Sequence, residues 1–178
     1  MTRILAAAAV ALAFSAAPAP FASVHAASGG GSTSTPECAK GRVWSRSKKK
    51  CVKLKRSSGL SDDELLGNAR TFAYAGRYRD ALDALALATN EKDPRILNYR
   101  GYATRKLGDV EGGLTFYRAA LAIDPDYTLA REYMGEAFLT LGRVDLARQQ
   151  LAEIERRCGT DCREYALLAD EIAAFEAR

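Results

Sequence analysis

The sequence predicts an all-α fold made of repeated helical hairpins, and three observations support this prediction. Apolar residues recur at helical spacing through nearly all of the chain after Gly59. Gly76, Gly108 and Gly142 follow one another at intervals of 32 and 34 residues, and each lies between two amphipathic runs. Self-similarity at such a period is typical of helical solenoids. A shift of 34 residues also superimposes similar residues: Gly101 on Gly135, Ala103 on Ala137, Gly108 on Gly142 and Val110 on Val144.

The first segment, residues 1–26, has the pattern of a secretory signal peptide. Arg3 supplies the positive charge at the start, and the run Ile4–Ala17 is apolar except for one serine. A transmembrane helix needs about 20 apolar residues, and this run is shorter and is followed by prolines. We therefore expect cleavage near Ala26, a periplasmic or secreted protein, and no transmembrane span.

A flexible linker rich in glycine, serine and threonine is expected over residues 27–36. Residues 37–59 then form a basic segment, with nine lysines or arginines and no acidic residue between Lys40 and Arg56. Its apolar residues lie on either side of a polar stretch, which predicts a short hairpin closed by a disulfide. Blocks of like charge are usually solvated and mobile, so we expect this segment to be a mobile head. Given export, the expected partner is not nucleic acid but an anionic envelope polymer, a lipid headgroup or an acidic protein.

The four cysteines form two pairs that are close in sequence, Cys38 with Cys51 and Cys158 with Cys162. An even number of cysteines in an exported chain suggests disulfides, and local pairing is the favoured one of three arrangements. A zinc site made of four thiolates is the alternative, but the spacings do not match the usual knuckle pattern. A redox-active pair at Cys158–Cys162 lacks the strand–helix context of such sites. We expect no cofactor and no metal.

The repeat resembles the tetratricopeptide repeat, a helix–turn–helix unit of 34 residues. The family has an apolar residue at position four, glycine or alanine at eight, an aromatic at eleven, alanine at twenty, an aromatic or large apolar residue at twenty-four, alanine at twenty-seven and proline at thirty-two. The first repeat has Leu65, Ala69, Phe72, Ala81, Leu85, Ala88 and Asp93 there; the second has Leu97, Gly101, Thr104, Gly113, Tyr117, Ala120 and Pro125; the third has Arg131, Gly135, Phe138, Ala147, Leu151, Ile154 and Gly159.

The resemblance implies three repeats within residues 60–161, at about 62–93, 94–127 and 128–161, followed by a capping helix at 162–178. The helical runs are 65–75 with 78–88, 96–107 with 110–123, and 129–141 with 144–154. Ser61 and Glu64 form a capping box before the first run. Asp93-Pro94 and Asp124-Pro125 are expected to end the second helices of the first two repeats, because a residue before proline avoids the helical region.

Three residues depart from the family pattern and predict looser packing where they stand. Asn68 and Arg100 occupy position seven, which is usually leucine, and Arg131 occupies the apolar position four. Gly135 is expected at a contact between helices, so that a larger side chain would overpack the contact. For Gly113, we expect substitution by alanine to be neutral or stabilising because alanine favours the helix.

The first helices of such repeats line a concave groove, and the resemblance implies that the binding residues lie there. Arginine forks and an asparagine amide could hold a peptide carboxylate or backbone, while tyrosines offer stacking area. Leu66 and Arg70 stand where the family's chaperone-tail binders have lysine and asparagine, so a chaperone tail is not expected. The candidates are Arg70, Tyr74, Arg95, Asn98, Tyr102, Arg105, Glu132 and Glu136.

An enzyme is disfavoured because the only histidine, His25, lies in the predicted leader. A mature chain without histidine lacks the usual general base and the commonest metal ligand. Asp62 and Asp63 are better explained by a helix N-terminus than by paired-carboxylate catalysis. We therefore expect a monomeric, exported interaction module or scaffold that binds a peptide or helix of a protein partner. The alternative is a structural envelope factor that docks on anionic polymer through the basic segment.

Overall fold

Seven α-helices and a two-stranded hairpin make up residues 35–178, the part of the chain that the computed structural model describes. The predicted signal peptide and residues 27–34 of the predicted linker lie outside it. The strands are β1 (Arg42–Ser45) and β2 (Lys50–Lys53), and a 3₁₀ turn covers Arg56–Ser58. The helices are α1 (Asp62–Tyr74), α2 (Tyr78–Leu85), α3 (Pro94–Lys106), α4 (Val110–Ile123), α5 (Thr128–Thr140), α6 (Val144–Cys158) and α7 (Arg163–Glu176).

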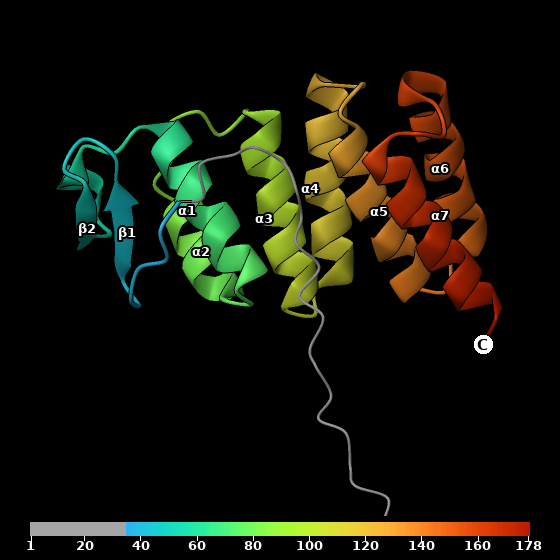
Figure 1. Ribbon diagram of the computed structural model, residues 1–178, viewed down its shortest axis with the longest axis horizontal. Helices are drawn as coiled ribbons and strands as arrows, with labels where there is room; N and C mark the ends of the chain where they lie inside the picture. The colour runs from blue at the N-terminus through green and yellow to red at the C-terminus, as the bar shows by residue number, and fades with distance from the viewer. Residues whose placement is uncertain (1–34) are drawn as a thin grey trace, which may run out of the picture. The chain divides into compact units, whose positions relative to one another are not determined.

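The helices are arranged as three consecutive hairpins, which confirms the predicted fold class. The first helix of each hairpin begins at the residue predicted to open a repeat, namely Asp62, Pro94 or Thr128. Within each hairpin the two helices pack together, and α2 contacts α3 as α4 contacts α5. The first helices also contact one another, α1 with α3 and α3 with α5, and Figure 1 shows the stacked series.

The turn inside each hairpin depends on a glycine. Gly76, Gly108 and Gly142 have φ angles of 75°, 103° and 71°, in the left-handed region. Side chains with a Cβ rarely adopt this conformation, so glycine is the residue that lets the chain reverse there. The interval that revealed the repeat is therefore the interval between these turns.

Two further glycines bring α3 and α4 into backbone contact. A Cβ on Gly101 would lie 2.6 Å from Cε1 of Tyr117 and 3.0 Å from the carbonyl oxygen of Gly113. A Cβ on Gly113 would lie 2.9 Å from the Cβ of Arg105, which belongs to the inner part of that side chain. The prediction that alanine is neutral or stabilising at Gly113 is therefore wrong, because the added methyl group has no room.

Gly135 lies at a helix contact, as predicted, and its neighbour is the C-terminal helix. A Cβ there would come within 2.5 Å of Cδ2 of the buried Leu168 on α7. Helix α7 packs against both α5 and α6, and so covers the last hairpin. This position agrees with its predicted role as a capping helix.

The connection between α2 and α3 differs from the prediction. Helix α2 ends at Leu85, eight residues before Asp93, so Asp93-Pro94 does not end it. Instead the Asp93 side chain accepts a hydrogen bond from the backbone N–H of Arg95, and Pro94 is the first residue of α3. The carboxylate of Asp62 accepts hydrogen bonds from the backbone N–H groups of Thr89 and Asn90, both at 2.8 Å, and thereby holds this loop against the start of α1.

The three polar residues at normally apolar positions bind backbone groups of neighbouring segments. Asn68 receives a hydrogen bond from the N–H of Trp44 at 2.5 Å and donates one to its carbonyl at 2.9 Å. Arg100 donates to the carbonyl of Leu85 at the end of α2. Arg131 donates to the carbonyl of Pro125 in the loop before α5. We predicted looser packing at these positions, but each polar side chain instead forms hydrogen bonds with a neighbouring segment.

The basic hairpin, residues 37–59, is docked on α1. Val43 is fully buried in the core shared with α1 and α2, and Asn68 of α1 holds the backbone of β1. The strands pair antiparallel, and the Cys38–Cys51 disulfide closes the segment as predicted. The expectation of a mobile head is therefore wrong for this segment. It covers the first helical hairpin, α1 and α2, at the end of the helical stack opposite α7 (Figure 1).

The second predicted disulfide, Cys158–Cys162, spans the turn between α6 and α7. No cysteine within residues 35–178 is free. Within the same residues no helix has the length and apolar character needed to cross a membrane.

Candidate functional site

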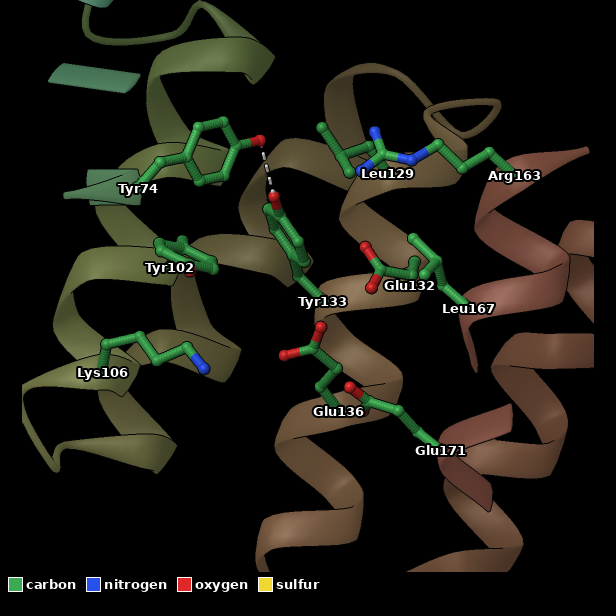
Figure 2. A pocket seen from close by; sticks show the side chains of 10 residues that line it. All are labelled: Tyr74, Tyr102, Lys106, Leu129, Glu132, Tyr133, Glu136, Arg163, Leu167 and Glu171. Carbon is green, nitrogen blue, oxygen red and sulfur yellow. Dashed lines mark hydrogen bonds between the residues drawn. The ribbon is translucent and has the colours of Figure 1, made fainter. Parts of the chain in front are cut away.

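A groove runs across the first helices of the hairpins and is bounded on one side by α7 (Figure 2). One cavity in it has a volume of about 190 Å³, and a second, of about 510 Å³, adjoins it through Lys106, Glu136 and Glu171. The smaller cavity is lined by Tyr74, Tyr102, Lys106, Leu129, Glu132, Tyr133, Glu136, Arg163, Leu167 and Glu171. The larger cavity is lined by Arg105, Lys106, Glu136, Leu139, Thr140, Glu171, Ala174, Phe175 and Arg178. We call the residues of both cavities the groove.

Aromatic rings form one wall of the groove. The hydroxyl of Tyr74 lies 3.0 Å from that of Tyr99 and 3.2 Å from that of Tyr133, so hydrogen bonds join α1, α3 and α5. The ring of Tyr102 lies 4.8 Å from the ring of Tyr133. Burial raises the pKa of Tyr102 to about 12, so its phenol is neutral at physiological pH. We call Tyr74, Tyr99, Tyr102 and Tyr133 the tyrosine cluster.

Three carboxyl groups also line the groove, and they belong to Glu132, Glu136 and Glu171. Glu132 and Glu136 are one turn apart on α5, and Glu171 faces them from α7 (Figure 2). Burial, and then the neighbouring Glu136, raise the pKa of Glu132 to about 10. Burial and Glu136 also raise the pKa of Glu171. Within residues 35–178 no group of three or more metal-ligating side chains has an arrangement that could hold a metal ion.

Arg105 is part of the interior rather than a free donor in the groove. Its side chain is 6% exposed, and its guanidinium forms an ion pair with Glu136. Nε of the same guanidinium donates a hydrogen bond to the hydroxyl of Tyr117 on α4. Because both contacts are internal, the guanidinium joins α3 to α4 and α5.

The structure places the other predicted arginines and Asn98 in pairs within the chain. The guanidinium of Arg70 lies 5.6 Å from the ring centroid of Tyr74. Arg95 forms ion pairs with Asp93 and Asp63. Asn98 is fully buried and donates a weak hydrogen bond to Tyr127 at 3.4 Å. The predicted cationic stretch is thus largely neutralised by internal partners, while Tyr74, Tyr102, Arg105, Glu132 and Glu136 do line the groove. Their part in binding stays a prediction.

Besides Lys106 and Leu129, which lie on the first helices of their repeats, four residues of the smaller cavity were not among the candidates: Tyr133, Arg163, Leu167 and Glu171. Tyr133 stands at position six of its repeat, where the second repeat has Tyr99. The other three belong to α7, which was considered only as a cap. When α7 is numbered from Arg163 as position one, Leu167 and Glu171 fall at positions five and nine, which Glu132 and Glu136 occupy in the third repeat. Continuing the repeat numbering into α7 would therefore have identified Leu167 and Glu171, although not Arg163.

Comparisons with known proteins agree with this arrangement. Residues 105–171 match the family model of the tetratricopeptide repeat. No curated protein matches the chain. Among solved structures, the first tetratricopeptide domain of human RPAP3 has a TM-score of 0.57 and 18% identity, over 65% of this chain and 92% of that one.

Two further structures give the same result. The first tetratricopeptide domain of Spaghetti (RPAP3), bound to the HSP90 peptide SRMEEVD, has a TM-score of 0.56 and 18% identity, over 66% of this chain and 94% of that one. MamA has a TM-score of 0.54 and 17% identity, over 67% of this chain and 77% of that one. At such identities the likeness concerns the fold. Together with the family match over residues 105–171, it shows that this chain has the fold of tetratricopeptide repeat domains, with three helical hairpins and a capping helix.

Proposed function

We propose that the chain is an exported protein-binding module, without catalytic activity, that holds a peptide or helix of a partner protein in its groove. The observation that carries this proposal is exposed apolar surface at that place. Within residues 35–178, four large apolar side chains are exposed, and two of them, Tyr74 at 51% and Leu167 at 39%, line the groove. Exposed apolar surface in a concave site is typical of binding sites.

The relatives support the same reading, since a tetratricopeptide domain of this fold binds the HSP90 peptide SRMEEVD. That peptide is rich in acidic residues, and the present groove contains three carboxyl groups. Leu66 and Arg70 also stand where chaperone-tail binders have lysine and asparagine. We therefore propose a partner segment other than an acidic chaperone tail.

Site-specific photocrosslinking tests the location of binding. A photoreactive benzoylphenylalanine replaces Leu167 in the groove or, as the matched control, Ile123, which is 48% exposed at the end of α4 and does not line the groove. In cells that make the protein, we expect a discrete crosslinked partner from position 167 and none from position 123. The same partner crosslinked equally from both positions would contradict a groove-specific function.

Export is part of the proposal, and two closed disulfides support it. Cys38–Cys51 and Cys158–Cys162 are bonds that persist in oxidising compartments. We expect the mature protein to begin near residue 27 and to contain no reactive thiol. Intact mass and N-terminal sequence of the protein recovered from the cell envelope test this. A reduced protein that keeps Met1–Ala26 would contradict export.

A second candidate function, docking on an anionic envelope polymer, rests on the basic hairpin. None of its nine lysines and arginines forms an ion pair with another residue of 35–178, and all nine are exposed. Replacing Lys48, Lys49 and Lys50 by glutamine should then release the protein from the envelope at lower salt. Retention that does not change would contradict this candidate.

A further inference from the structure

We propose that the groove anchors its partner through a cationic side chain, a lysine ammonium or an arginine guanidinium. The cation would lie between the carboxyl groups of Glu132, Glu136 and Glu171 and the rings of Tyr74, Tyr102 and Tyr133 (Figure 2). This inference rests on the proposed function and specifies which chemical group of the partner the groove recognises.

The first argument is an unsatisfied buried oxygen. Glu132 is 2% exposed, and its Oε2 has no hydrogen-bond partner among the described residues. Buried polar atoms are nearly always hydrogen-bonded, because an unpaired one destabilises the folded chain. Since Glu132 lines the cavity, as Figure 2 shows, a group that enters the cavity can supply the partner that the chain does not.

The second argument is the pairing of charges around the cavity. The guanidinium of Arg105 on α3 already forms an ion pair with Glu136 and a hydrogen bond with the hydroxyl of Tyr117. No ion pair within residues 35–178 involves Glu132 or Glu171. Two carboxyl groups thus face the cavity without a cation of their own. The charged or titratable groups that face Glu132 are Tyr102, Arg105 and Lys106 of α3, Tyr117 of α4, Tyr133 and Glu136 of α5, Arg163 and Glu171 of α7, and Tyr74 of α1.

The third argument is the aromatic wall. Tyrosine faces attract cations, and the tyrosine cluster already attracts those of the chain: the ammonium of Lys106 and the guanidinium of Arg105 each lie 5.6 Å from the ring centroid of Tyr102. Carboxyl groups opposite aromatic rings therefore provide both kinds of contact that an organic cation uses. The cavity of about 190 Å³ has room for the end of one long side chain.

Proton release provides an independent sign of such binding. The pKa of Glu132 is raised by burial and by Glu136, so the group is protonated near neutral pH. A bound cation stabilises the ionised form, and binding must then expel a proton. We therefore expect the affinity for a cationic peptide to rise as the pH rises from about 6 to about 8.

The test uses capped alanine pentapeptides with lysine, arginine or methionine at the centre, titrated into the ¹⁵N-labelled chain and followed by NMR. The methionine peptide is the neutral control of similar length. We expect the lysine peptide, the arginine peptide or both to shift amide signals of α5 and α7, at least tenfold more tightly than the methionine peptide. The cationic peptide that binds more tightly shows whether the groove prefers a lysine ammonium or an arginine guanidinium.

Glu132→Gln removes the ionisable carboxyl group but keeps the size of the side chain, so it tests the charge without changing the shape of the cavity. This variant should bind the cationic peptide at least tenfold more weakly and lose the pH dependence. Glu155→Gln, which removes an exposed carboxylate on α6, should behave like the parent chain. Retained affinity in Glu132→Gln, or cation-induced shifts outside the groove, would overturn the inference.

Failure of the inference differs from failure of the proposed function. If the methionine peptide binds the groove as tightly as the cationic ones, the cation anchor is wrong and peptide binding stands. If none of the three peptides shifts the signals of α1, α3, α5 or α7, both the anchor and the groove function are contradicted.

Discussion

Individual polar side chains in this protein hold segments together that apolar packing alone would leave apart. The amide of Asn68 makes the two hydrogen bonds that a neighbouring strand would make with Trp44, and so fixes the hairpin to α1. Arg105 joins three helices by its contacts with Tyr117 and Glu136. At the scale of residues, departures from an apolar repeat pattern therefore mark places where one segment docks on another.

Asn68→Leu tests the docking role directly. Leucine restores the residue typical of the repeat but leaves the backbone N–H and carbonyl of the half-buried Trp44 on β1 without partners. We expect a loss of about 1–3 kcal/mol in the free energy of unfolding and faster hydrogen exchange at the Trp44 amide. Exchange measured by NMR and denaturant melts check both. A stabilised variant with an unchanged Trp44 amide would show that packing, not the amide, holds the hairpin.

Glu132→Gln has a predicted effect on stability as well as on binding. The pKa of Glu132 rises from 4.5 to about 10 on folding. Its stabilising contribution to the free energy of unfolding is therefore complete below about pH 4.5 and is lost as the pH rises towards 10. Glutamine does not titrate, so we expect the variant to gain stability over the parent chain from about pH 5 to about pH 9. Thermal melts across this range, with Glu155→Gln as control, measure the difference. A constant difference at all pH values would mean that Glu132 is ionised in the folded chain.

At the scale of helices, the contacts depend on where side chains are absent. Gly101 and Gly113 face each other across α3 and α4, and each would place a Cβ within 3.0 Å of the other's carbonyl oxygen. Gly135 makes room for Leu168 in the same way. Close packing of this kind cannot accept a methyl group without displacement of a helix.

Gly113→Ala is therefore expected to cost about 1–3 kcal/mol of stability, although alanine is the better helix former. Gly67→Ala is the matched control, since Gly67 is also inside a helix but its added Cβ would meet only the side chains of Thr35 and Arg46. That control should be neutral or slightly stabilising. Equal melting temperatures for the two variants would contradict the close approach of α3 and α4.

The positions of the helices could be predicted from the sequence because periodicity and turn glycines are local signals. The first residues of α1, α3 and α5 and both disulfide pairs agree with the prediction. The early end of α2 could not be predicted, because it depends on Asp62 holding the backbone of Thr89 and Asn90, a tertiary contact. The burial of Arg105 and Asn98 was missed for the same reason: a groove position on a helix does not show which partner a neighbouring helix supplies.

At the scale of the whole described chain, both ends of the helical stack are covered. The basic hairpin packs on α1, and α7 packs on α5 and α6 (Figure 1). Terminal repeats have an apolar face that needs such a cover. Because α7 also lines the groove, it serves both the stability of the last hairpin and the proposed binding site.

The basic hairpin and the groove belong to different parts of this stack, so their contributions to binding can be separated. Deleting the hairpin is unsuitable, because Val43 is part of the core and Asn68 would lose its partners. Replacing Arg105 is equally unsuitable, since it would leave Glu136 without its cation. Substitutions at exposed positions avoid both problems.

The most direct test of the groove function is the affinity of the partner crosslinked at position 167, measured across a salt series. Leu167→Ala removes exposed apolar surface from the groove without removing a hydrogen bond, whereas glutamine at Lys48, Lys49 and Lys50 removes charge from the hairpin. We predict that the groove variant loses binding at every salt concentration with its helical signal intact, and that the hairpin variant changes mainly the salt dependence. Full affinity in the groove variant together with loss of binding in the hairpin variant would contradict the account.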